Sequence, residues 1–72
     1  MDTEYRTRLI DSLLAMRDSS DGTLLNQVRT IGVTTTRNLL FGEAVRLQHS
    51  DQQTALDCAA LVDRIDALVR PA

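Results

Sequence analysis

The sequence contains few of the residues that build catalytic centres, metal sites and disulfides. Its single cysteine, Cys58, excludes an intrachain disulfide, and its single histidine, His49, lies nine positions earlier, with no spacing typical of metal ligands. The three glycines are isolated from one another, which excludes a glycine-rich phosphate loop. No base stands near Cys58 in the sequence to activate its thiol as a nucleophile. We therefore expect no enzyme activity and no metal or cofactor site, with Cys58 as a buried structural thiol and His49 as a helix-junction residue.

Long apolar runs are also missing from the chain. None approaches the roughly 18 residues that a membrane-spanning helix needs. Residues 1–6 carry acids where a signal peptide has basic residues followed by an apolar stretch. A single cysteine gives no indication of an oxidising compartment. We therefore expect a cytoplasmic protein with no segment in a membrane.

Aromatic residues are scarce and lysine is absent. Tyr5 and Phe41 are the only Phe, Tyr or Trp side chains, and all eight basic residues are arginine. Eleven leucines therefore supply most of the apolar side-chain volume, a composition typical of helix bundles and not of β-sandwiches. The formal net charge of −2 supplies no general attraction to a phosphate backbone, so a nucleic-acid partner is not expected. The sequence predicts an all-α protein that forms one domain with a small core.

The spacing of the apolar residues predicts helices over residues 2–17, 23–48 and 51–70, the second disturbed near residues 32–36. Asp18–Gly22 reads as a loop, because its polar side chains compete for backbone hydrogen bonds and a glycine follows them. We expect the helices to pack as a two- or three-helix antiparallel hairpin or bundle.

The predicted helix ends carry recognisable signals. Ser50 and Gln53 have the spacing of a capping box at the start of the last helix, and Pro71 stops that helix. Candidate N-caps of the other helices are Asp2 or Thr3 for the first and Thr23 for the second.

The middle segment is interrupted by five residues that all disfavour helix, Gly32–Thr36. Glycine does so through backbone entropy and the β-branched residues through their restricted χ1 angle. We expect a helix that kinks or ends near Gly32 and resumes at Thr34 or Thr35. The alternatives are a turn and an intersubunit strand. The strand would need a second subunit, because nothing else in the chain can pair with it.

The last predicted helix carries an apolar arc that is wider than a single neighbouring helix covers. A chain this short has few residues with which to cover the arc, so we expect it to bind a protein partner. That partner is either a second copy in a homodimer or another helical protein. The residues expected at the partner surface are Ala55, Ala59, Leu61, Val62, Ile65 and Leu68, together with Leu39 and Phe41 from the middle segment.

The tetrad Ile31-Gly32-Val33-Thr34 resembles the turn of a helix-turn-helix DNA-binding protein. On this alternative, the resemblance implies a small regulator in which Thr35, Thr36 and Arg37 face the major groove. A further alternative is a self-associating helical hairpin, similar in architecture to plasmid copy-control bundles.

A longer stretch, from about Asp21 to Val69, resembles the small helical chaperones of bacterial type III secretion needle subunits. Three features carry the resemblance: the apolar stretch and glycine of Leu39-Leu40-Phe41-Gly42, the helix start Asp51-Gln52-Gln53, and the Ala/Leu/Ile face that follows. The resemblance implies a cytosolic co-chaperone. Such a protein, together with a second helical chaperone, keeps an aggregation-prone needle subunit soluble before export.

Overall fold

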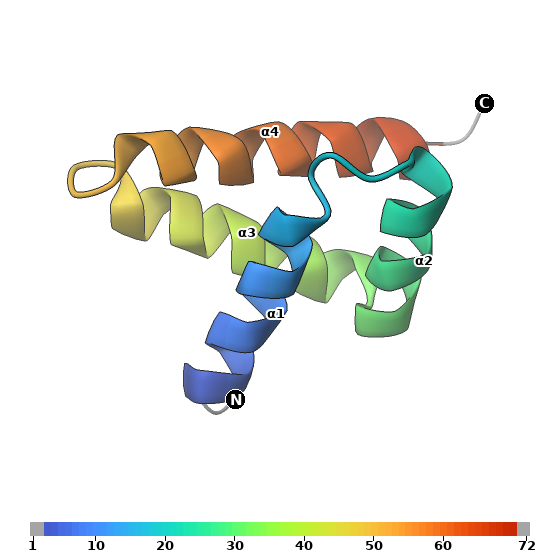
Figure 1. Cartoon of the computed structure of the whole chain (residues 1–72), viewed down its shortest axis with the longest axis horizontal. Coiled ribbons are helices and arrows are strands. Elements are labelled where there is room, and N and C mark those ends of the chain that lie inside the picture. The colour runs from blue at the N-terminus through green and yellow to red at the C-terminus, as the bar shows by residue number, and fades with distance from the viewer. Residues whose placement is uncertain (1–2, 71–72) are drawn as a thin grey trace.

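The computed structural model describes residues 3–70, and these form four helices and no strand. Figure 1 shows α3 and α4 side by side in opposite directions, with α1 running across them and α2 at the end where α3 begins. The prediction of an all-α protein is confirmed, but the described part of the chain forms four helices where we expected two or three. Their bounds are α1 (Thr3–Ala15), α2 (Asp21–Ile31), α3 (Val33–Leu47) and α4 (Gln52–Val69).

The additional helix arises at Gly32, which separates α2 from α3. Its φ angle of 109° lies in a region that side chains with a Cβ rarely adopt. The Gly32 N–H donates to the Val28 carbonyl at 2.7 Å and ends α2. The Gly32 carbonyl accepts from the Thr36 N–H at 2.9 Å and starts α3. The expected restart at Thr34 or Thr35 is therefore wrong, because one glycine serves as the end of one helix and the start of the next.

The helix starts differ from the predicted caps. Asp51, not Ser50, caps α4, because its carboxylate accepts both the Thr54 N–H at 3.2 Å and the Thr54 hydroxyl at 2.7 Å. Gln53 does not complete a capping box and donates to Asp57 at 3.1 Å instead.

At α2, the cap is Ser20, whose hydroxyl accepts the Thr23 N–H at 3.2 Å. The predicted cap Thr23 is therefore already inside the helix. The loop lies two positions earlier than expected, at residues 16–20, because α1 ends at Ala15 and not at residue 17, and Asp21 and Gly22 belong to α2. The expected cap at Asp2 and stop at Pro71 lie outside the described residues.

A single cluster of buried apolar side chains joins the α3–α4 hairpin to the two shorter helices. On α4, the buried residues recur every three or four positions, as the sequence predicted for this helix. Cys58 is fully buried among them, which confirms its expected place in the core. The buried apolar residues are Ile10, Leu13, Leu24, Val28, Leu39, Leu40, Ala55, Cys58, Leu61 and Ile65.

Within residues 3–70, no helix is both long enough and apolar enough to cross a bilayer.

Candidate functional site

One flank of the α3–α4 hairpin carries an apolar strip that no other helix within residues 3–70 covers. On α3, Phe41 and Val45 lie one helical turn apart, with 65% and 51% of their surface exposed. On α4, half-buried Val62 lies beside Phe41, and exposed Ala59 is its neighbour at i−3. We call this strip, together with Arg37 and Asn38 at its α2 end, the open face.

The opposite flank of α3 is covered by α1. Arg6 of α1 lies beside Leu39, and Ile10 lies one turn further on beside Glu43. Glu43 is buried there, and its carboxylate accepts from Arg46 Nε at 2.5 Å. The position of α1 therefore decides which flank of the hairpin is left open.

A hollow of about 240 Å³ opens on the open face and is lined by Arg37, Asn38, Phe41 and Val62. Small-molecule pockets typically measure about 300–1,000 Å³, so this hollow is of a size for one side chain. Arg37, which lines the hollow, pairs through its Nε with the Asp66 carboxylate at 2.7 Å. The open face therefore combines a projecting ring, a recess beside it and a neutral ion pair.

The eight residues predicted at the partner surface fall into three groups. Phe41 and Ala59 are exposed on the open face. Val62 and Leu68 are half-buried and pack against the core cluster. The other four are buried within the chain and offer no surface in this conformation, namely Leu39, Ala55, Leu61 and Ile65.

Sequence reasoning omitted three residues of the open face, Arg37, Asn38 and Val45. Val45 follows Phe41 at i+4, a spacing that could have identified it. Arg37 and Asn38 carry no such signal, because their place depends on which flank α1 covers.

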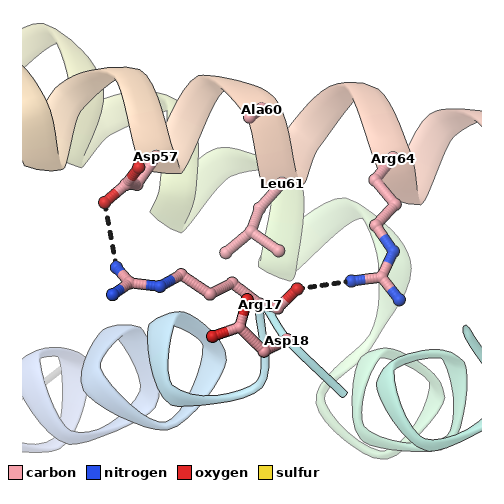
Figure 2. A pocket seen from close by; sticks show the side chains of 6 residues that line it. All are labelled: Arg17, Asp18, Asp57, Ala60, Leu61 and Arg64. Carbon is pink, nitrogen blue, oxygen red and sulfur yellow. Dashed lines mark hydrogen bonds and ion pairs between the residues drawn. The ribbon is translucent and has the colours of Figure 1, made fainter. Parts of the chain in front are cut away.

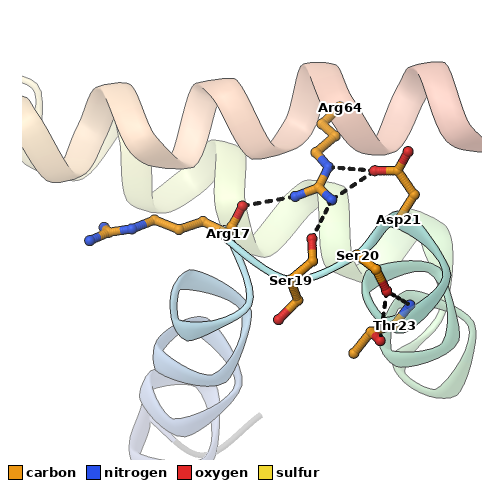
Figure 3. Close-up of polar contacts among 6 residues, drawn as sticks. All are labelled: Arg17, Ser19, Ser20, Asp21, Thr23 and Arg64. Carbon is orange, nitrogen blue, oxygen red and sulfur yellow. Dashed lines mark hydrogen bonds and ion pairs between the residues drawn. The ribbon is translucent and has the colours of Figure 1, made fainter.

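A second polar cluster holds the connection between α1 and α2 against α4. The Arg64 guanidinium donates to the Asp21 carboxylate at 2.7 Å and to the backbone carbonyls of Arg17 and Ser19 at 2.9 and 2.7 Å (Figure 3). The neighbouring hollow, of about 190 Å³, is bridged by Arg17 and Asp57 at 2.9 Å (Figure 2). Because these guanidinium groups are already bonded within the chain, we interpret the cluster as a clasp that positions α1 and not as a ligand site.

The remaining chemistry-bearing residues form no centre among residues 3–70. Burial raises the pKa of the Cys58 thiol, and the nearby charges of Glu43 and Asp57 raise it further. A raised pKa leaves less of the reactive thiolate at neutral pH. His49 is exposed in the turn before α4, and no group of three metal-binding side chains occurs in the described part of the chain.

The helix-turn-helix alternative expected Thr36 to face a DNA groove, and the structure contradicts this. Thr36 is fully buried, and its hydroxyl donates to the Gly32 carbonyl at 2.8 Å. Arg37 is half-exposed but paired with Asp66.

Comparison with known proteins adds no further constraint: no family model, curated protein or solved structure matches the chain.

Proposed function

We propose that this protein is a small helical interaction module whose open face docks a helical protein. The observation that supports the proposal is the exposure of Phe41 and Val45 beside Val62, on a hairpin flank that the other helices leave uncovered. Burying one large apolar side chain fully contributes roughly 1.5–3 kcal/mol of favourable free energy. Two neighbouring exposed side chains of this kind therefore favour association with a partner that covers them. A helix is the natural occupant, because its side chains can follow the shallow groove between two antiparallel helices.

The finer proposal is that the protein is a cytosolic co-chaperone of a type III secretion needle subunit. It is supported by the resemblance over about Asp21–Val69 and by the α3–α4 hairpin, which exposes an apolar flank as a helical chaperone requires. The resemblance implies a first hairpin helix that runs straight, whereas the break at Gly32 turns the chain before α3 begins. A client would therefore meet the hairpin along α3 and α4, where Phe41 lies.

Co-expression with a needle subunit and the helical chaperone of the same secretion system tests this proposal. We expect the tagged wild type to co-purify with both proteins and Phe41→Asp to lose them. The matched control is Tyr5→Asp, an equivalent change at an aromatic residue that is 55% exposed on α1 and lies outside the open face. Circular dichroism of each variant checks that the helices are intact. Failure of the wild type to recover either protein would refute the co-chaperone proposal, and equal recovery by both variants would refute the role of the open face.

A further inference from the structure

We infer that the open face binds the open face of a second copy of this chain, giving a reversible two-fold dimer. The inference rests on the proposed function, because it names a partner for the same surface. Its support comes from the shape, the charge and the size of that surface.

The shape of the open face is self-complementary. A two-fold dimer brings the same patch of both copies together, so the patch must offer both a projection and a recess. Phe41 projects, with 65% of its surface exposed, and the hollow of about 240 Å³ lies directly beside it. With the two-fold axis close to Phe41, the ring of each copy enters the hollow of the other. Each ring then contacts Val62 and the opposite ring, an arrangement that aromatic side chains favour.

The charge of the open face permits such self-association. The chain carries a net charge of −2, and two copies of an acidic patch would repel one another. The open face, however, has one charged member, Arg37, which pairs with the neighbouring Asp66 at 2.7 Å, and its other members are uncharged. Two copies can therefore meet without like charges facing each other.

The size of the open face sets the strength of the dimer. The open face consists of six residues, and only two of them, Phe41 and Val45, are large exposed apolar side chains, whereas a stable interface uses about 20–30 residues a side. Stable complexes bury about 800 Å² per partner, and smaller contacts are usually transient. We therefore expect a dissociation constant in the micromolar range and exchange with any partner that covers more area.

Sedimentation velocity of the purified chain between about 1 and 300 μM tests the inference. We expect the wild type and Tyr5→Asp to shift from monomer to dimer with rising concentration. Phe41→Asp should weaken the dimer at least about tenfold, since a residue at the centre of an interface carries a large share of its energy. A wild type that stays monomeric over the whole range would overturn the inference, and so would equal dimerisation of Phe41→Asp and Tyr5→Asp.

Disulfide trapping provides a second measurement that does not depend on a charged substitution. The native thiol, Cys58, is fully buried, so a cysteine introduced at the surface is the reactive one. Under mild oxidation we expect Val45→Cys, which keeps the Phe41 ring and lies one helical turn from it, to form a covalent dimer and Tyr5→Cys to remain monomeric. Equal trapping of the two variants would show random collision and would contradict a two-fold axis near Phe41.

The outcomes separate this inference from the proposed function. A monomeric wild type that recovers the needle subunit through Phe41 would overturn the dimer and support a different helical partner on the open face. Dimerisation through Phe41 without recovery of the needle subunit would support the dimer and refute the co-chaperone proposal. If neither occurs, both are wrong.

Discussion

Replacing Gly32 with alanine tests whether the break between α2 and α3 is a true turn or a kink caused by weak helix propensity. A propensity kink would be relieved by alanine, and stability would rise by about 0.5–1 kcal/mol. The structure instead gives Gly32 a φ angle of 109°. A Cβ at this position would lie 3.6 Å from the Thr35 hydroxyl, an ordinary contact, so the cost comes from the backbone conformation and not from a clash.

The expected magnitude follows from two opposing effects. Holding a residue with a Cβ in such a conformation costs about 1–3 kcal/mol. Alanine recovers about 0.4–1 kcal/mol by restricting the unfolded chain. We therefore expect Gly32→Ala to lower the free energy of unfolding by about 1–2 kcal/mol, which corresponds to a fall in Tm of about 4–15 °C in a chain of this size.

Gly22→Ala is the matched control for this experiment. Gly22 lies inside α2, and a Cβ there would meet nothing within 4 Å. The same substitution should therefore raise stability by about 0.5–1 kcal/mol. Urea and thermal denaturation followed by circular dichroism measure both variants. If Gly32→Ala proves as stable as the wild type, or shifts in the same direction as Gly22→Ala, the assignment of a required turn at Gly32 is refuted.

Three further predictions concern the core, the clasp and the α4 cap. Cys58→Ala should cost about 1 kcal/mol in packing, and the native Cys58 thiol should react with a thiol reagent only as fast as the chain unfolds. Arg64→Ala should lower the free energy of unfolding by about 1–3 kcal/mol and speed amide hydrogen exchange at residues 16–20. Arg64→Lys should show a similar loss of stability, because lysine lacks the guanidinium fork that bonds both carbonyls. Hydrogen bonds from the Thr54 hydroxyl and N–H lower the pKa of Asp51. Its stabilising contribution is therefore present above the unfolded pKa of about 3.9 and is lost as pH falls through the lower folded pKa. Asp51→Asn keeps a capping side chain that does not titrate. The free energy of unfolding of this variant, measured by denaturation at a series of acidic pH values, should therefore fall less steeply with decreasing pH than that of the wild type.

The helical class and most of the α4 core follow from the sequence alone. Leucine-rich composition and spacings of three and four are local properties, and a helix expresses them wherever it packs. For this reason Cys58, Leu61 and Ile65 share one apolar face of the last helix, and the structure buries all three. Leu61 and Ile65 were expected at a partner surface, but they pack within the chain.

The α4 cap and the break at Gly32 depend on backbone geometry, which the spacing of apolar residues in the sequence does not specify. Ser50 and Asp51 both suit a helix N-cap, and Asp51 has that role because its carboxylate reaches both donors of Thr54. The sequence predicted that the middle helix kinks or ends near Gly32. Its positive φ angle, which splits that segment into α2 and α3, depends on how the two helices pack against α4.

The open face was decided by tertiary structure. Leu39 and Phe41 are both apolar, lie two positions apart on α3, and were predicted together at the partner surface. The chain buries Leu39 and leaves Phe41 exposed, because α1 covers the flank of α3 that carries Leu39. Part of what holds α1 in place is the clasp that Arg64 makes with the backbone of residues 17 and 19, more than 40 positions away in the sequence. An amphipathic pattern identifies which side chains are apolar, but only the packing of distant segments determines which of them are left for a partner.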